Sequence, residues 1–518
     1  MKKRLLALVL VVVMVVSMLI ACGTRDNNKE EDKVSANTEI KVADVKPTLK
    51  VLGGASSSDL NDTIEAKDIE DATGYKVEYY GLPADNGNQA LMLTLANKND
   101  YDLVSMNISQ FTTLRKNGAL LALNDYIDAI APELWDCIPE EAWQGVSDEE
   151  GNVYALPKLY SVEKEVASFI MVRMDLCRAA GITELPTTIN GFKDMLVKLK
   201  AYYGDDYIIL SGPYNVTSTG NFLNIPMCIS SAFGIYNDWM VDENGNIIYM
   251  TEHENFDDMI DFMNELYKEG ILDIDYSSNS YKTVDEKFAS GKAILAVNGR
   301  ETINTTFATL QDSGLTEADI EFIGALHGDD GTCTYMQTNQ YGGFMGIPVR
   351  NPKNAADTIA WTAAKVKNQE YIAIGEEGVH FEWGDDGYPV PIQPKFTDER
   401  NRISSLIYFA DMRTYPTQLL ARLRKTEIMW KAYTNCTITA NENEPEIFVP
   451  AYFAYCNSNT YATNNAALLK SLNDYISLLV VGQRNYEKDM TTFTSDFKNF
   501  EGEAMRTELK EWYDKNFK

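Results

Sequence analysis

The stretch LKVLGGASSSDLNDTIEAKDIEDATGYKVEYYGLPADNGNQALMLTLANKNDYDLVSM, residues 49–106, decides the fold. Short apolar runs at 49–52, 75–80 and 101–106 predict three β-strands. The two longer segments between them, one ending at Ala72 and the other covering 89–97, predict helices. This alternation favours an α/β fold with a mostly parallel sheet covered by helices.

Sheets of this kind bind ligands beyond the carboxyl ends of their strands. Loops 53–59 and 105–110 follow two of the predicted strands, so both are candidate walls of a ligand cleft. The folded part begins near Leu49 and leaves about 470 residues, more than a single core holds. The sequence therefore predicts two sizeable lobes.

The first residues carry a targeting pattern. Basic residues at 2–4 precede an apolar run at 5–20, an order typical of a secretory signal. The run ends in LIACG at 19–23, which resembles the lipobox of bacterial lipoproteins. We expect a signal peptide at 1–21, a lipid on Cys22 and a flexible tether at 22–47. An uncleaved anchor with an incidental cysteine is the alternative, and both interpretations place the rest outside the cytoplasm.

Charge and composition exclude several partners. The chain has 76 acidic and 46 basic residues, a net charge of −30, which argues against nucleic acid and against a polyanion held by charge alone. An acidic sugar met by a local arginine stays open. The six cysteines after Cys22 form no Cys-x-x-Cys pair and the three histidines are scattered, so we expect no metal site and no cofactor. Disulfides and buried free thiols both remain open.

Five segments, in order, carry a family resemblance. They are DEEGNVYALPK at 148–158, VRMDLCRAAGITELPTTINGF at 172–192, NELYKEGILD at 264–273, EKFASGKAILAV at 286–297 and GIPVRNPKNAA at 346–356. Together they resemble family 1 extracellular solute-binding proteins of bacterial ABC importers, the group that includes maltose-binding proteins. EGVHFEWGDD at 377–386 is similar to a segment of the long lipoprotein-type members from Gram-positive bacteria.

The resemblance implies a two-lobed, periplasmic-binding-protein-like fold of type II with the ligand between the lobes. It assigns 48–160 and 338–430 to lobe 1, and 161–337 and 431–518 to lobe 2. Crossings are expected near 158–164, 337–342 and 428–448. The resemblance also implies a monomeric, lipid-anchored subunit on the extracellular face of the membrane. Such a subunit captures a carbohydrate, expected to be an oligosaccharide, and delivers it to the transmembrane subunits of a permease.

Signatures of enzymes are missing from the sequence. Gly291-Lys292 lacks the rest of a phosphate-binding loop, and the glycines at 342–346 have the wrong spacing for a dinucleotide site. Residues 242–246 predict a hairpin turn rather than a calcium loop, because the glycine is fourth and not sixth. We therefore expect a protein without enzymatic activity. Two carboxylates distant in sequence can still form a glycosidase pair, so a secreted, lipid-anchored glycan-degrading enzyme is the alternative. A third hypothesis is a cell-surface sensor or adhesion module that has kept the fold.

Sugar sites combine aromatic platforms with groups that hydrogen-bond hydroxyls. Tyr214 follows a predicted strand where maltose-binding members place a stacking tyrosine, so it is the first candidate platform. Trp239 is the second, and Tyr341 and Trp383 lie near expected crossings. Arg300 follows the strand at 293–297 and is a candidate for binding a carboxylate or a pair of hydroxyls. The alternative for each ring is a place in the core or in a hairpin, and for Arg300 a solvated or ion-paired side chain.

Overall fold

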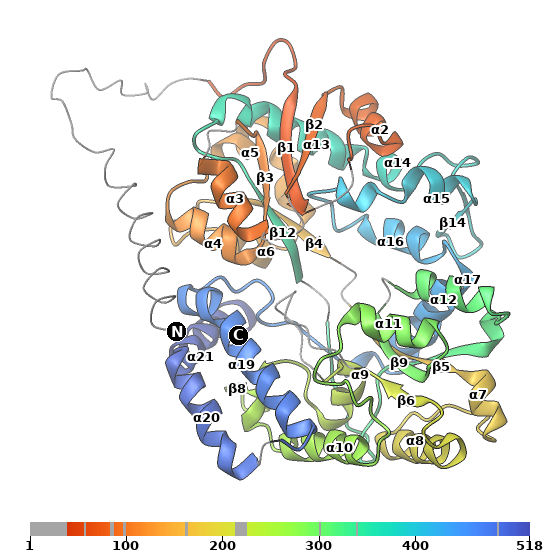
Figure 1. Ribbon diagram of the computed structural model, residues 1–518. Coiled ribbons are helices and arrows are strands. Elements are labelled where there is room, and N and C mark those ends of the chain that lie inside the picture. Colours follow the sequence, from red (N-terminus) through yellow and green to blue (C-terminus); the bar gives the residue numbers. More distant parts are fainter. Residues whose placement is uncertain are drawn as a thin grey trace, which may run out of the picture. The chain divides into compact units, whose positions relative to one another are not determined.

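Two β-sheets organise the chain (Figure 1). The first has the strand order β2-β1-β3-β12-β4 and the second the order β10-β5-β9-β6. We call each sheet with the helices packed on it lobe 1 and lobe 2. The structure is a computed structural model that describes residues 39–55, 59–82, 87–96, 100–160, 164–212, 225–299, 302–337, 340–483 and 486–518. The predicted two-lobed α/β fold is confirmed.

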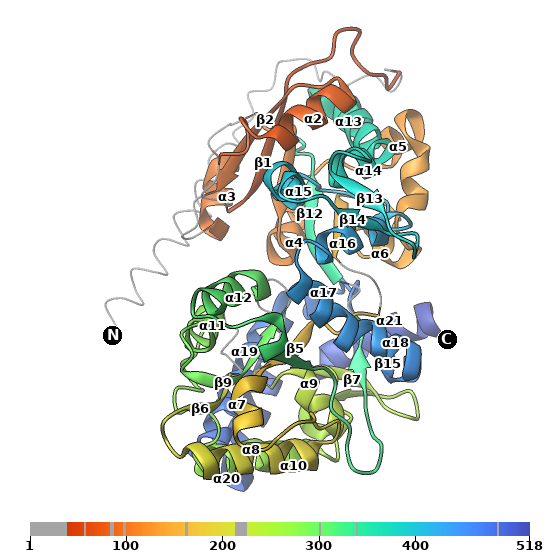
Figure 2. The same ribbon diagram turned by 90° about the vertical axis from the view of Figure 1, so that its right-hand side faces the viewer.

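The strands of lobe 1 are β1 (Leu49–Ala55), β2 (Val77–Leu82), β3 (Leu103–Met106), β4 (Leu156–Tyr160) and β12 (Gln340–Gly346). Its helices are α2 (Ile64–Thr73), α3 (Gly87–Ala96), α4 (Ile108–Lys116), α5 (Asn124–Ile130), α6 (Glu140–Gln144), α13 (Ala355–Lys367), α14 (Gln369–Ile374), α15 (Lys395–Arg400) and α16 (Tyr415–Leu423). A hairpin of β13 (Phe381–Trp383) and β14 (Pro389–Pro391) belongs to the same lobe. Helices α2, α13 and α14 pack against one another (Figure 2).

The strands of lobe 2 are β5 (Ser168–Arg173), β6 (Ile208–Ser211), β9 (Ala293–Gly299) and β10 (Ile320–Ile323). Two small ladders join β7 (Trp239–Val241) to β8 (Ile247–Tyr249) and β11 (Tyr335–Met336) to β15 (Phe448–Val449). Its helices are α7 (Met174–Ala179), α8 (Ile189–Tyr203), α9 (Met227–Ser230), α10 (Phe256–Lys268), α11 (Tyr281–Ala289), α12 (Ile303–Asp312), α17 (Glu427–Tyr433), α18 (Thr439–Asn443), α19 (Asn459–Val480), α20 (Tyr486–Asn499) and α21 (Gly502–Phe517). Within the described ranges, no helix combines the length and apolar character needed to span a bilayer.

The opening β1-α2-β2-α3-β3 confirms the alternation predicted for residues 49–106. β1 pairs in parallel with β2 and with β3. Helix α2 begins after Thr63, whose hydroxyl accepts a hydrogen bond from the amide of Ala66 at 3.2 Å. It ends at Gly74, which has a φ of 69° and so adopts a left-handed conformation that favours glycine.

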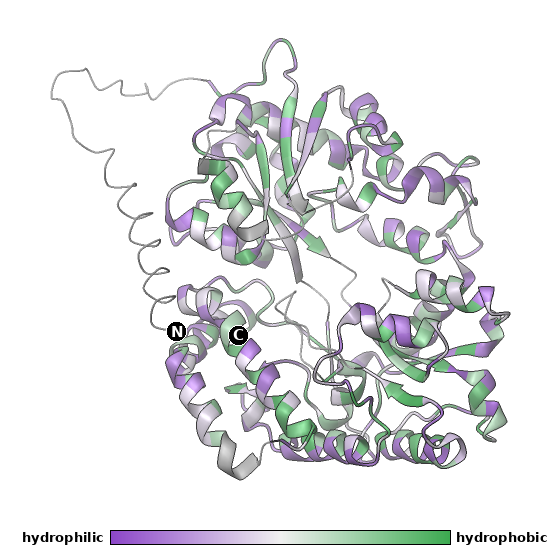
Figure 3. Cartoon of the chain, in the orientation of Figure 1, coloured by the Kyte–Doolittle hydropathy of each residue, from purple (hydrophilic) through white to green (hydrophobic). Residues whose placement is uncertain are grey.

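Lobe 2 buries both faces of its sheet. On β5, Ile170 and Val172 lie in one buried cluster, while Phe169 and Met171 lie in a second cluster on the other face. A strand that is covered on both faces reads as a continuous apolar run, and Figure 3 shows this sheet coloured mainly as hydrophobic. Because both faces of this sheet are buried, groups that could contact a ligand lie at its edges and strand ends.

Each sheet has one reversed strand among its described strands. β12 is antiparallel to both β3 and β4, and β5 is antiparallel to both β9 and β10. These are the strands that the chain enters directly from the other lobe. A strand that the chain enters at the edge nearest the other lobe has to run away from that edge. The remaining strands run in the opposite direction, so they end at that edge.

The chain returns to lobe 2 through α16 and α17, near the crossing expected at 428–448. Arg424 Nη1 binds Asp386 Oδ1 of the β13-β14 turn at 3.2 Å. Two residues later, the hydroxyl of Thr426 donates to Asn304 Oδ1 of α12 at 2.5 Å. Leu419 and Leu423 of α16 already lie in the buried cluster of the lobe 2 sheet, so the side-chain contacts change from one lobe to the other along α16 and not at a single point. The full assignment of residue ranges to lobes stays a prediction.

The six cysteines after Cys22 are free thiols, and five of them are buried. Burial raises the pKa of Cys137 to about 12. These thiols are therefore protonated at neutral pH and behave as small apolar side chains. The structure favours the buried-thiol alternative over disulfide pairing.

Among the described residues of lobe 1, the side-chain amine of Lys365 is buried with no carboxylate beside it. Lys365 on α13 is 5 % exposed, and its Nζ donates to the carbonyl of Leu406 at 3.3 Å. Burial, and then repulsion from Lys158, lowers the pKa of Lys365 to about 7. The ring of Trp361, whose centroid lies 3.8 Å from Nζ, stabilises the charged form and partly offsets this effect.

Replacing Lys365 with methionine should reduce the pH dependence of stability. The folded-state pKa of about 7 lies below the ordinary 10.5, so the unfolded chain binds this proton more tightly. The free energy of unfolding is therefore lowest below pH 7 and rises from about pH 7 to pH 10, by at most about 1.4 kcal/mol per pH unit from this group. Urea denaturation at pH 7 and pH 9 should show a smaller gain in Lys365→Met than in the parent.

The control for this measurement is Lys367→Met, which removes an exposed amine from the same helix. It should follow the parent at both pH values. Equal gains in the parent and in Lys365→Met would contradict a titrating buried amine.

Candidate functional site

The carboxyl ends of the parallel strands define one edge of the lobe 1 sheet. Ala55 pairs with Leu82, so β1 and β2 end together. Gln340 pairs with Tyr160, so β12 starts where β4 ends. The sequence predicts the ligand side of the fold at this edge.

The lobe 2 sheet has the matching edge. Gly299 at the end of β9 lies opposite Ser168 at the start of β5, and β6, parallel to β9, ends at Ser211. The chain connects the two edges between Tyr160 and Ser168, and it passes again from lobe 2 to lobe 1 between Met336 of β11 and Gln340 of β12. Since a chain spans at most about 3.5 Å per residue, the first segment holds the two edges within about 30 Å of each other.

Two side chains of the predicted wall 105–110 cap the start of helix α4. Asn107 Oδ1 accepts from the amide of Gln110 at 2.9 Å, and Gln110 Oε1 accepts from the amide of Asn107 at 2.8 Å. This reciprocal pair is a capping box at the start of α4. Both side chains therefore serve the helix terminus at this edge.

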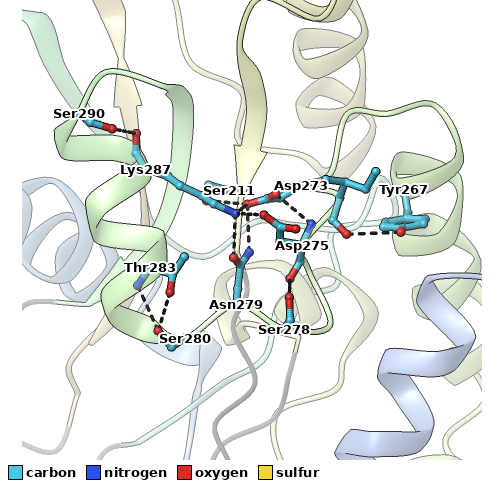
Figure 4. Close-up of polar contacts among 11 residues, drawn as sticks. Ser211, Tyr267, Asp273, Asp275, Ser278, Asn279, Ser280, Thr283, Lys287 and Ser290 are labelled. Atoms are coloured by element: carbon cyan, nitrogen blue, oxygen red, sulfur yellow. Dashed lines mark hydrogen bonds and ion pairs between the residues drawn. The ribbon is translucent and has the colours of Figure 1, made fainter.

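A polar network lies at the end of β6 (Figure 4). The carboxylate of Asp273, whose side chain is 0 % exposed, accepts from the hydroxyl of Ser211 at 3.2 Å, from Asn279 Nδ2 at 3.0 Å and from Lys287 Nζ at 2.7 Å. Lys287 Nζ also donates to Asp275 Oδ2 and to Asn279 Oδ1, each at 2.9 Å. These residues come from β6, from the loop before α11 and from α11 itself. We call these five residues the Asp273 network.

Electrostatics keeps the ions of the Asp273 network charged. Burial alone would raise the pKa of Asp273, but the hydrogen bonds from Lys287 and Asn279 outweigh it and hold the pKa below its usual value. Burial likewise lowers the pKa of Lys287, while its hydrogen bonds to Asp273 and Asp275 raise it overall. One ammonium thus neutralises two carboxylates in part, and Asp275 remains the exposed member.

The backbone beside this network extends the sheet. Leu210 donates its amide to Ile271, and the amide of Asp273 donates to Leu210, at 3.1 Å and 3.0 Å. Residues 271–273 therefore run parallel to β6 and end at the same edge. Gly212 follows with a φ of 95°, and a Cβ there would lie 3.1 Å from the Cβ of Val297. A glycine is required where the chain turns so close to β9.

Trp239 lies in the core of lobe 2. It is 0 % exposed, and its indole Nε1 donates to Asn465 Oδ1 at 2.9 Å. Its ring packs edge-on against Tyr249, with centroids 4.7 Å apart, and contacts Phe497. A ring enclosed in this way has no face for a sugar in this conformation, so the geometry supports the packing alternative. Ligand contact at Trp239 stays a prediction.

Tyr341 lies at the lobe 1 edge but is engaged by the protein. Its hydroxyl donates to the carbonyl of Ala142 at 2.6 Å, and its ring packs on Phe344 and Tyr455 at 4.7 and 4.8 Å between centroids. The close approach leaves no room for a side chain at Gly145, where a Cβ would meet the Tyr341 hydroxyl at 2.0 Å. Tyr341 therefore joins α6, β12 and the segment that precedes α19.

Trp383 presents its ring to solvent. It ends β13, is 42 % exposed and packs edge-on against the buried Phe381 at 5.3 Å between centroids. Tyr388 and Val390 of the same hairpin are also exposed. Of the candidate rings that the structure describes, Trp383 is the one with an open face.

Tyr214, Arg300 and Cys22 lie outside the described residues. Their roles as stacking platform, oxygen-binding arginine and lipidation site stay predictions. The described parts of the chain contain no group of three or more His, Cys, Asp or Glu residues arranged to hold a metal ion.

The Asp273 network was not predicted from the sequence, although two of the family-like segments supply its central residues. Asp273 closes NELYKEGILD, and Lys287 lies in EKFASGKAILAV. A signal was available, because an acid directly after an apolar run sits at a strand end, where a buried carboxylate needs a partner. Nothing in the spacing identified Lys287 as that partner.

The geometry defines a class of protein: two α/β lobes, each with one reversed strand, with facing sheet edges joined by short crossings. This is the architecture of two-lobed periplasmic-type binding proteins. The solved structure of alginate-binding protein AlgQ2, without calcium ion, superposes with a TM-score of 0.68 and 18 % identity, covering 92 % of this chain and all of that one. FusA of S. pneumoniae, an ABC-transporter substrate-binding protein solved with kestose, gives a TM-score of 0.64 and 17 % identity over 90 % of this chain and 99 % of that one. At these identities the likeness shows the fold.

The sequence comparisons place the chain in a family. The family profile described as bacterial extracellular solute-binding protein matches residues 57–367. An uncharacterized protein in the butB 5' region of Niallia circulans is 30 % identical over 264 residues, which cover 49 % of this chain and 98 % of that protein. Lipoprotein LipO of Bacillus subtilis is 22 % identical over 350 residues, 64 % of this chain and 67 % of LipO. The chain therefore belongs to the bacterial extracellular solute-binding protein family.

The contrast between Trp239 and Trp383 predicts different effects on folding. Trp239→Ala removes a fully buried ring and should lower the free energy of unfolding by about 3 to 5 kcal/mol. Trp383→Ala truncates a ring that is largely in water and should cost about 1 kcal/mol or less. Chemical denaturation of both variants measures the difference. A small loss at Trp239, or equal losses at the two sites, would contradict the packing described here.

Proposed function

We propose that this protein is the lipid-anchored, extracellular solute-binding subunit of an ABC importer. It captures a carbohydrate, an oligosaccharide, between the edges of its two sheets and delivers it unaltered to a membrane permease. The observation that carries the proposal is the pairing of family membership with two strand-end edges joined by short crossings.

Three further observations support a carbohydrate as the ligand. Of the structural neighbours that share the fold, AlgQ2 is an alginate-binding protein and FusA was solved in complex with kestose. The lobe 2 edge carries an exposed carboxylate, Asp275, of the kind that accepts hydrogen bonds from sugar hydroxyls. Trp383 offers an exposed aromatic face, which suits the apolar face of a sugar ring.

Each lobe has its own main buried cluster, which allows the lobes to close around a ligand while both of these clusters stay intact. A ligand that contacts both edges binds the closed form more tightly and shifts the population toward it. The closed form then presents a distinct surface to the permease. Membership of the family and the lipobox at Cys22 support this location at the cell surface, as does the lipoprotein relative LipO. Mass spectrometry of the N-terminal peptide decides the anchor, and an unmodified Cys22 would contradict it.

A thermal-shift screen against mono- and oligosaccharides tests the function. At a concentration of 100 times its Kd, a sugar that binds the folded state stabilises it by about 2.7 kcal/mol. The stabilising sugar should then be recovered unchanged after incubation with the protein. New reducing ends produced with turnover would favour the glycan-degrading alternative, and no shift with any sugar would contradict carbohydrate capture.

Titration of the stabilising sugar into Trp383→Ala tests the exposed ring. Loss of the stacked area should weaken binding by about 1 to 3 kcal/mol, roughly ten- to hundredfold, because buried apolar area contributes about 25 cal/mol per Å². Trp239→Ala is titrated alongside: its place in the core predicts parent affinity in the folded fraction, and weaker affinity there would support ligand contact at Trp239. Unchanged affinity in Trp383→Ala would exclude this ring as a platform.

A further inference from the structure

We propose that Asp273 and Lys287 are positioning residues of the ligand site, which fix the lobe 2 edge without contacting the ligand themselves. The inference rests on the proposed function, because it assigns residues to the same site. It concerns the shape of the edge at Ser211, Gly212 and Asp275.

The Asp273 carboxylate has no acceptor capacity left for a ligand. Its Oδ2 accepts from Ser211, Asn279 and Lys287, and its Oδ1 accepts from the amide of Asp275 at 3.1 Å. A carboxylate has about four acceptor positions, so the protein already fills them. Because the side chain is also 0 % exposed, Asp273 acts on a ligand through the groups it holds.

Lys287 is saturated in the same way. An ammonium has three donor hydrogens, and those of Lys287 are directed to Asp273, Asp275 and Asn279 (Figure 4). Its side chain is largely enclosed. Lys287 therefore ties α11 to the strand end and sets the direction of the exposed carboxylate of Asp275.

The network links segments that are otherwise held at this edge by few bonds. Ser211 is the last residue of β6, and residues 271–273 pair with β6 through the two backbone hydrogen bonds at Leu210. Removing the ammonium leaves a buried carboxylate without its cation, which is costly. The strand end and the loop at 273–279 would then rearrange to reach water, and the edge would lose the shape that receives the ligand.

The test compares Lys287→Met with the parent in two measurements. In the ligand-free protein, amide hydrogen exchange should become faster in peptides covering 208–212 and 271–279 and stay unchanged in the lobe 1 strand at 49–55. Calorimetric titration with the sugar that stabilises the parent, well below the melting temperature, should show affinity weaker by about tenfold or more. Lys287→Arg keeps the cation and should restore part of both properties.

The matched control is Lys282→Met on the same helix. The Lys282 side chain is 85 % exposed and its ammonium pairs with Glu286 at 3.6 Å, so its loss should leave both measurements at parent values. A purely structural role of Lys287 predicts a lower melting temperature with parent affinity in the folded fraction, and that result would overturn the proposal. Unchanged exchange at 208–212 and 271–279 would overturn it as well.

Failure of the proposed function gives a different pattern. A parent protein that binds no sugar of the panel contradicts carbohydrate capture. The exchange measurement does not depend on a ligand, so it still supports or overturns the ordering of this edge by Lys287.

Discussion

A strand that the chain enters directly from the other lobe has to run away from the edge where it enters. β5 and β12 are the two strands in this position, and each is reversed relative to its neighbours. The other strands of both sheets therefore point their carboxyl ends at the crossings. This constraint gathers the loops, the helix starts and the polar side chains of two separate lobes at the same two edges.

Polar side chains gather at the sheet edges because the apolar cores exclude them. Both faces of the lobe 2 sheet are covered by apolar side chains, so polar groups remain at the strand ends. At the end of β6 this produces a carboxylate that is buried and yet charged, because Lys287 and three further donors meet it. Buried polar groups require such satisfaction, and here it also rigidifies the place where a ligand is proposed to bind. In lobe 1, the capping box of Asn107 and Gln110 satisfies backbone amides at the start of α4.

Local pattern predicted the fold well and the site only in part. The opening strands and helices of residues 49–106 were predictable because period and turn residues are local properties, and the family segments extended this to two lobes. The environment of Trp239 depends on Asn465 and Phe497, more than 200 residues away in the chain, so the sequence could not separate platform from core. Asp273 and Lys287 are 14 residues apart and meet because α11 turns back over the strand end. Burial of Lys365 was equally hidden, since a lysine on an amphipathic helix is usually exposed.

We propose that a carbohydrate binds between two facing strand-end edges. A crystal structure of the protein with its stabilising sugar tests this most directly. The account predicts a single intact sugar that contacts groups from both edges, near residues 53–55 or 106–107 in lobe 1 and near 211–212 or 273–275 in lobe 2. A sugar held by one lobe alone, or one cleaved beside a pair of carboxylates, would contradict it.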